Sequence, residues 1–177
     1  MIRITGGINR SRLLETPNVS TTKPTMDKVR AGVFSALGPA VEGANVLDLF
    51  AGSGSYGFEA LSRGAARATF VDSSSVAVDI IKKNASKLNQ ENVTIIQGDV
   101  LAFLEQNLQE FSIIFVDPPY KLDVYEDVVK TLIRRNILSS NAIIVLESER
   151  ELNIDESLFS KVKLYKYGLA KVYILRK

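Results

Sequence analysis

NVLDLFAGSGSYGFEALSRG, residues 45–64, runs from an apolar, β-prone segment through a glycine-rich turn into a segment with helical spacing. The turn carries Gly52, Gly54 and Gly57 in G-x-G-x-x-G spacing. Glycines at these positions let the backbone turn tightly and approach a ligand closely, and the helix that follows presents free N–H groups. The stretch therefore predicts the strand-to-helix loop of a nucleotide-binding α/β sheet.

Two carboxylates extend this pattern. Asp72 ends the second apolar run, where a carboxylate can accept both hydroxyls of a ribose. Asp48 ends the first run, and its charge would repel a pyrophosphate but suit a cofactor that carries an ammonium and a sulfonium. The glycine loop and Asp72 alone fit either a nicotinamide dinucleotide or an adenosine cofactor without phosphates. A tight turn followed by an Asp that caps the next helix is the structural alternative.

A third feature follows the third apolar run. At Gly98-Asp99-Val100 the carboxylate can accept from an adenine amino group while the valine packs on the ring. Asp99 is equally suited to cap the helix that the next residues predict, and the two roles are compatible. Asp99 and Val100 are therefore candidate cofactor residues.

Outward from these loops, β-prone apolar runs alternate along the chain with segments whose apolar residues recur at helical spacing. The runs are almost continuously apolar, as expected when helices cover both faces of a parallel sheet. The expected strands are 45–50, 68–72, 92–97, 112–117 and 142–147, and the expected helices are 56–64, 76–88, 100–108 and 125–135. Residues 162–167 and 170–176 predict a closing hairpin. The pattern thus predicts an α/β sheet of five parallel strands followed by antiparallel ones.

The residues before this sheet form a smaller unit. RITGGINRSRLLETP, residues 3–17, predicts a β-hairpin that turns at Gly6-Gly7, followed by a polar linker and a helix over about 26–37. A chain of 177 residues fits one domain with its own core. We expect a single domain, 1–177, made of an N-terminal extension, 1–24, and a catalytic core, 25–177.

Composition excludes several kinds of chemistry. The chain has no cysteine and no histidine, which removes disulfides, the thiolate nucleophile, and the commonest general base and zinc ligand. Catalysis must therefore rest on carboxylates, backbone groups and hydroxyls. The sequence has no apolar run long enough to span a membrane and no secretory signal, so we expect a cytoplasmic protein.

Basic residues are concentrated towards the two ends. Residues 1–30 hold six Lys/Arg against two acids, and 161–177 hold six against none, whereas 31–160 carries a net charge of −8. This asymmetry favours a partner rich in phosphates, and ordinary solvated lysines are the alternative explanation. The candidates for phosphate contact are Arg10, Arg12, Lys23, Arg30, Lys163, Lys166 and Lys171.

The fourth expected strand ends in IIFVDPPY, residues 113–120. Ligands of open α/β sheets bind beyond the carboxyl ends of the strands, so Asp117 is expected beside the ligand of the glycine loop. An exocyclic amine of a nucleobase is a poor nucleophile because its lone pair is delocalised into the ring. The Asp117 carboxylate and the Pro118 carbonyl can hold its two hydrogens out of plane, and Tyr120 can stack on the base. A Pro-Pro turn after a strand-ending Asp is the alternative.

Taken together, these motifs resemble class I S-adenosylmethionine-dependent amino-methyltransferases with a [D/N]-P-P-[Y/F/W] site. More specifically, the RsmD-type 16S rRNA (guanine-N2)-methyltransferase family is similar in four stretches, namely 3–17, KPTMDKVRAGVFSAL (23–37), LDLFAGSGSYGFEALSRGA (47–65) and FVDPPY (115–120). That family methylates the N2 amine of a guanine in small-subunit ribosomal RNA. The resemblance implies a seven-stranded Rossmann-like methyltransferase sheet with an antiparallel end, and an N-terminal hairpin that helps to grip RNA.

The same resemblance implies roles for individual residues. Its cofactor residues are Thr25, Asp48, Ala51, Gly52, Ser53, Gly54, Asp72, Asp99 and Val100. Thr25 would close over S-adenosylmethionine, while Asp48, Ala51, Gly52 and Ser53 would line its methionine end. Its target-base residues are Asp117, Pro118 and Tyr120. The implied reaction is an in-line methyl transfer to a neutral guanine amine, with no covalent intermediate and no metal.

Four other functions remain open from the sequence. An adenine-N6 methyltransferase would use the same tetrapeptide, although the chain has no room for a separate DNA-recognition domain. A protein or small-molecule amine acceptor would leave Tyr120 and the basic ends unexplained. A nicotinamide oxidoreductase would use the glycine loop but not DPPY, and a nucleic-acid-binding module without activity would explain only the charge. We expect a monomer that acts on ribosomal RNA or an assembling small subunit.

Overall fold

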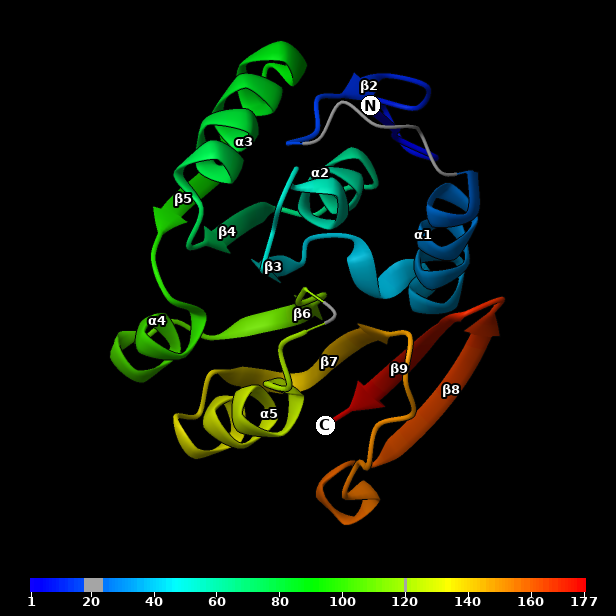
Figure 1. Ribbon diagram of the computed structural model, residues 1–177, viewed down its shortest axis with the longest axis vertical. Coiled ribbons are helices and arrows are strands. Elements are labelled where there is room, and N and C mark those ends of the chain that lie inside the picture. The colour runs from blue at the N-terminus through cyan, green and yellow to red at the C-terminus, as the bar shows by residue number, and fades with distance from the viewer. Residues whose placement is uncertain (18–23, 120) are drawn as a thin grey trace.

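The computed structural model describes residues 1–17, 24–119 and 121–177 as a layered α/β structure (Figure 1). The strands are β1 (Ile2–Arg3), β2 (Leu13–Leu14), β3 (Asn45–Leu49), β4 (Arg67–Asp72), β5 (Val93–Gln97), β6 (Phe111–Val116), β7 (Leu138–Ser148), β8 (Lys161–Tyr167) and β9 (Ala170–Arg176). The helices are α1 (Pro24–Leu37), α2 (Ser55–Ser62), α3 (Ser75–Leu88), α4 (Val100–Gln106) and α5 (Tyr125–Arg134), with 3-10 turns η1 (Gly38–Val41) and η2 (Glu156–Leu158). None of the described helices is both long and apolar enough to cross a membrane.

In the described part of the chain, seven strands form one sheet in the order β5-β4-β3-β6-β7-β9-β8. Strands β3 to β7 run parallel, and β9 pairs antiparallel with both β7 and β8. The predicted sheet of five parallel strands with an antiparallel end is therefore confirmed. From β3 the chain adds β4 and β5 on one side, and β6 and β7 then lie on the other side of β3. The strand order therefore reverses between β3 and β6, which is where open α/β sheets bind ligands.

Helices cover both faces of this sheet. α1, α2 and α3 pack on one face, and α4 and α5 pack on the other (Figure 1). Adjacent strand residues point to opposite faces, so β6 sends Phe115 into the first core and Val116 into the second. Both residues are 1% exposed, and burying a large apolar side chain contributes about 1.5–3 kcal/mol. Two-sided burial is the reason that the strands read as continuous apolar runs.

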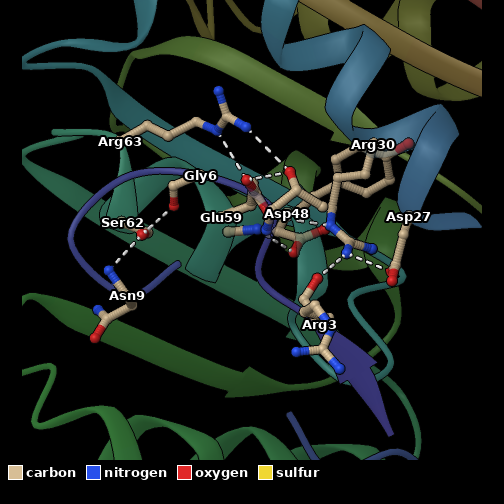
Figure 2. A network of polar contacts seen from close by, with 12 residues as sticks. Arg3, Gly6, Asn9, Asp27, Arg30, Asp48, Glu59, Ser62 and Arg63 are labelled. Carbon is tan, nitrogen blue, oxygen red and sulfur yellow. Dashed lines mark hydrogen bonds and ion pairs between the residues drawn. The ribbon is translucent and has the colours of Figure 1, made fainter. Parts of the chain in front are cut away.

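The N-terminal hairpin is confirmed, but its turn is longer than Gly6-Gly7 predicts. β1 and β2 pair antiparallel, and residues 4–12 connect them. This connection lies against α2, because the N–H of Asn9 donates to Ser62 Oγ at 2.9 Å and the Ser62 hydroxyl donates to the Gly6 carbonyl at 2.6 Å (Figure 2). A Cβ on Gly7 would lie 1.7 Å from the Ser62 carbonyl oxygen. The two glycines therefore serve close docking on α2 as well as the turn.

Some boundaries differ from those expected. α1 begins at Pro24 rather than near residue 26, and β7 begins at Leu138, four residues before the predicted strand. The early part of β7 continues past a register shift between Phe111 and Ile113 of β6. Its polar residues gave no apolar run to mark it. The predicted linker falls largely on residues 18–23, which lie outside the described part of the chain.

Candidate active site

The glycine-rich loop joins β3 to α2 near the middle of the sheet. Gly52 and Gly54 have φ of +57° and +75°, a region that residues with side chains rarely adopt. Gly57 is needed for another reason, since a Cβ there would lie 2.2 Å from Cε1 of Phe70. Glycine at this position lets α2 pack directly on β4. The three glycines thus set both the turn and the distance between helix and sheet.

Asp72 lies at the carboxyl end of β4, beside this loop. Its Oδ2 accepts from the N–H of Gly52 at 2.8 Å, and its Oδ1 accepts from the N–H of Ser74 at 2.8 Å. An ionised carboxylate has about four acceptor positions, so each oxygen keeps one for a further donor. The carboxylate is therefore fixed in orientation and able to accept a pair of ribose hydroxyls.

Asp99 and Val100 lie at the start of α4, after β5. Asp99 caps the helix, because its Oδ1 accepts from the N–H of Ala102 at 2.9 Å. Its side chain is exposed, whereas Val100 is buried. The capping role that the sequence predicted is thus confirmed, and it leaves the second carboxylate oxygen of Asp99 for another donor.

One cleft of about 350 Å³ joins these residues to the end of β6. It is lined by Phe50, Gly52, Asp72, Ser73, Asp99, Val100, Asp117, Pro118, Pro119 and Leu122. Six of these ten are predicted site residues, and they come from four different strand ends. Three of the lining residues are Asp and, among these described residues, none is Lys or Arg. The cleft is therefore suited to a cationic ligand rather than to a pyrophosphate.

Four predicted cofactor residues are buried and are not among the residues that line this cleft, namely Asp48, Ala51, Ser53 and Gly54. Asp48 is 3% exposed, and its Oδ2 accepts from the N–H of Gly57 at 2.9 Å. Burial raises the pKa of Asp48 to about 8, the Gly57 N–H opposes that rise, and the charge of Asp72 adds to it. Asp48 thus braces the loop, and its direct contact with a cofactor stays a prediction.

Asp117 follows β6 at the cleft, and the Pro-Pro turn comes directly after it. The N–H of Leu122 donates to the Pro119 carbonyl at 2.8 Å, which closes the turn. Burial raises the pKa of Asp117 well above its usual range, and the charges of Glu147 and Asp48 raise it further. These effects shift Asp117 towards the protonated acid, and a cation in the cleft would shift it towards the carboxylate.

Glu147 stands beside Asp117 without lining the cleft, and the sequence analysis did not single it out. β6 and β7 are parallel with Val116 opposite Leu146, which places Asp117 beside Glu147. The available signal was that the apolar run AIIVLE ends in an acid, as SIIFVD does. β6 and β7 are consecutive in the chain and adjacent in the sheet, but only their pairing register shows that the two acids stand opposite each other.

Aromatic residues fix the position of Glu147. The Tyr56 hydroxyl donates to Glu147 Oε2, and the Tyr125 hydroxyl donates to the Glu147 carbonyl at 2.7 Å. The ring of Tyr56 stacks on Phe115 with centroids 4.7 Å apart. Burial raises the pKa of Glu147, while the Tyr56 hydroxyl and the charge of Arg30 oppose that rise. A second, oriented carboxylate therefore stands next to Asp117.

The prediction that Arg30 contacts phosphate is wrong. Arg30 is 2% exposed, and its guanidinium pairs with Asp27 at 2.8 Å and with Glu59 at 3.2 Å (Figure 2). Glu59 is fully buried and also pairs with Arg63 at 2.8 Å. The cluster joins α1 to α2. Arg30 therefore neutralises a buried acid, and a count of charges along the chain could not reveal this.

The other described basic candidates lie in two separate regions. Arg10 and Arg12 are exposed in the 4–12 connection, beside α2 and α3. Lys163 and Lys166 are exposed on the edge strand β8, and Lys171 is half-buried on β9. α1 lies between the two regions (Figure 1). The structure does not gather these cations into one patch, and their contact with phosphate stays a prediction.

Three predicted residues lie outside what the structure describes. They are Lys23, Tyr120 and the side chain of Thr25. Their roles in phosphate contact, base stacking and closure over a cofactor stay predictions. Across residues 1–17, 24–119 and 121–177, no group of three or more potential ligands is placed to hold a metal ion.

Comparisons with known proteins agree with this architecture. The family model described as Conserved hypothetical protein 95 matches residues 2–176. The ribosomal RNA small subunit methyltransferase D of Escherichia coli K12 is 38% identical over 150 residues, which cover 85% of this chain and 76% of that protein. The solved structure of yhhF from Escherichia coli superposes with a TM-score of 0.85 and 32% identity, covering 99% of this chain and 97% of that one.

A further solved structure bears on the site. The 16S rRNA N2 G1207 methyltransferase (RsmC) of T. thermophilus, in complex with AdoMet and guanosine, has a TM-score of 0.73 and 25% identity, and the match covers 90% of this chain and 44% of that one. A match to the D-type enzyme over most of both chains excludes the oxidoreductase alternative. This chain belongs to the RsmD-type family of small-subunit ribosomal RNA methyltransferases, within the class I S-adenosylmethionine-dependent methyltransferases.

Proposed function

We propose that this protein transfers the methyl group of S-adenosylmethionine to the exocyclic N2 amine of a guanine in 16S ribosomal RNA. The observation that carries the proposal is the single cleft shared by Asp72, Val100, Asp117 and Pro118. The E. coli relative is named a small-subunit rRNA methyltransferase, and the T. thermophilus enzyme is named an N2 methyltransferase of 16S rRNA. The guanine N2 target is our extension from these names to this chain.

The cleft residues fit a cationic adenosine cofactor. Each oxygen of Asp72 keeps an acceptor position for a ribose hydroxyl, beside the two backbone N–H groups that orient it. Asp99 would accept from the adenine amino group, and Val100 would pack on the ring. When bound, the cofactor supplies a methyl group on a sulfonium, whose carbon–sulfur bond breaks as an amine lone pair attacks.

Asp117 and the Pro-Pro turn would hold the amine. The Asp117 carboxylate and the Pro118 carbonyl would each accept a hydrogen bond from the amine. These two hydrogen bonds would draw the amine lone pair out of conjugation with the ring. The amine becomes positively charged as its new bond forms, and the negative carboxylate stabilises that charge. Burial raises the pKa of Asp117, so the carboxylate is also a competent acceptor for the surplus proton, which then passes to water.

Ribosomal RNA would be gripped outside the cleft. The exposed Arg10 and Arg12 and the lysines of β8 and β9 would contact phosphates on either side of α1. Tyr120, next to the Pro-Pro turn in sequence, would stack on the base withdrawn from its helix. Affinity for RNA should then fall steeply with salt. We propose a monomer that acts in the cytoplasm on ribosomal RNA or the assembling small subunit.

Mass spectrometry of nucleosides tests this proposal in cells. Small-subunit rRNA from cells that lack the protein should lose one N2-methylguanosine. The wild-type gene should restore it, and the Asp117→Ala gene should not. Unchanged N2-methylguanosine together with loss of N6-methyladenosine would favour the adenine alternative and reject the guanine target.

A further inference from the structure

Two carboxylates stand side by side where β6 and β7 end, and the proposed reaction uses only one of them. Val116 pairs with Leu146, so Asp117 and Glu147 are neighbours across strands that lie about 4.8 Å apart. Val145, two residues before Glu147, belongs to the core that packs against α1 and α2. The Glu147 side chain therefore leaves the sheet on that same face.

Glu147 is oriented by its surroundings. The Tyr56 hydroxyl donates to Oε2, and the Tyr56 ring is buried against Phe115. Among the described residues no donor contacts Oε1, which leaves this oxygen for a ligand. The hydroxyl and the charge of Arg30 favour the ionised form of Glu147 against the effect of burial. An acceptor is thus held in place beside the amine site.

Guanine and adenine differ at the ring atom next to the reactive amine. Guanine carries a hydrogen on N1 beside its N2 amine, whereas adenine carries an unprotonated N1 beside its N6 amine. Two adjacent carboxylates present acceptors to the two neighbouring donors of guanine. With adenine, one carboxylate would face a lone pair. A site built to accept a hydrogen bond strongly rejects an analogue that cannot donate it.

We infer that Glu147 selects guanine by accepting its N1–H through Oε1, while Asp117 and the Pro118 carbonyl hold the N2 amine. Tyr56 is the positioning residue that fixes the Glu147 carboxylate. This inference rests on the proposed guanine-N2 methylation and explains why that amine, rather than the adenine amine, is the acceptor. One well-placed contact to a base edge discriminates roughly 10- to 100-fold.

The test compares guanine with 2-aminopurine at the target position. 2-Aminopurine keeps the reactive 2-amine but has an unprotonated N1 and no O6. The probe is a synthetic RNA that spans the target nucleotide, located by mass spectrometry of oligonucleotides from small-subunit rRNA, and it is assembled into small subunits if naked RNA is not methylated. Single-turnover methyl transfer is measured for wild type, Glu147→Gln, Tyr56→Phe and Glu91→Gln. Glu91 is exposed just before the edge strand β5, three strands away from β6, and serves as the matched control.

The informative quantity is the ratio of guanine to 2-aminopurine rates within each variant, because the missing O6 affects every variant alike. The amide of Glu147→Gln can donate to an unprotonated N1, so its ratio should fall roughly tenfold or more from the wild-type value. Tyr56→Phe keeps the stacked ring and should lower the ratio by a smaller factor. Glu91→Gln should match wild type, and S-adenosylhomocysteine affinity should be preserved in all four proteins.

The outcomes separate this inference from the proposed function. If Glu147→Gln slows both substrates equally and leaves the ratio unchanged, Glu147 is only structural and the inference is overturned. If Glu147→Gln does not fold, an unchanged ratio in Tyr56→Phe overturns it instead. Failure of the wild-type protein to methylate guanine in this RNA would reject the proposed function itself.

Discussion

Asp117 and Glu147 lie side by side at the ends of parallel strands β6 and β7, and the charge of Glu147 helps to raise the pKa of Asp117. Burial is the larger cause, and the charge of Asp48 adds to both. The proposed reaction uses the ionised form of Asp117, because a negative charge stabilises the amine as it becomes positive. Activity should therefore be present above the raised pKa of Asp117 and should be lost as pH falls through it.

The first prediction concerns this acid limb of the pH profile. The apparent pKa from kcat/KM should lie well above the usual range of an aspartate. Glu147→Gln removes a neighbouring negative charge, so the limb should move to lower pH even where the rate is reduced. The measurement is methyl transfer to small subunits over a pH series. A limb that moves to higher pH, or does not move, would show that Glu147 does not control the ionisation of Asp117.

The second prediction separates chemistry from cofactor binding at Asp117. Asp117→Ala should lower turnover by roughly 10²–10³-fold, the effect of removing one electrostatic group from a transition state. Its affinity for S-adenosylhomocysteine, measured by calorimetry, should stay close to wild type because the ribose and adenine contacts remain. Turnover at the wild-type level would place the amine site elsewhere.

The third prediction is that a substitution at Asp72 weakens cofactor binding, unlike the substitution at Asp117. Asp72→Ala removes the carboxylate assigned to the ribose hydroxyls, so S-adenosylhomocysteine should bind roughly 10- to 100-fold more weakly. Asp79→Ala is the matched control, because Asp79 is exposed on α3 and pairs with Lys82 at 3.8 Å. Thermal unfolding should show that both variants fold. Equal affinity in Asp72→Ala and Asp79→Ala would rule out the ribose role.

The fourth prediction concerns the buried ion pairs of Arg30 and Glu59. Glu59→Gln removes the acid that Arg30 and Arg63 share and leaves Arg30 with Asp27 alone, and the Arg30–Glu59 pair is almost fully buried. Breaking such a pair costs about 3–5 kcal/mol of unfolding free energy, which urea denaturation would measure. Glu126→Gln, which breaks an exposed pair with Lys130, should leave stability unchanged. Equal stability of the two variants would mean that the cluster does not hold α1 on α2.

Much of the fold could be predicted because a parallel strand that is buried on both faces appears in the sequence as an apolar run. The same logic brought Gly52, Asp72, Asp99 and Asp117 together, since the carboxyl ends of parallel strands share one edge of the sheet. All four line one cleft in the structure.

The misses have physical causes as well. An acid at the end of an apolar run marks only a strand end, and the register of β6 with β7 is needed to place Glu147 opposite Asp117. Arg30 looked like one more cation in a basic segment, and only the packing of α1 on α2 shows its burial beside Glu59. Two glycines after β1 predicted the hairpin but not the docking of its long connection on α2.

The most direct test of the central claim uses the purified protein, labelled S-adenosylmethionine and small subunits from cells that lack the protein. We expect label in small-subunit rRNA, recovered as N2-methylguanosine, with wild-type protein and none with Asp117→Ala. Label recovered in another nucleoside, or equal labelling by Asp117→Ala, would contradict the account.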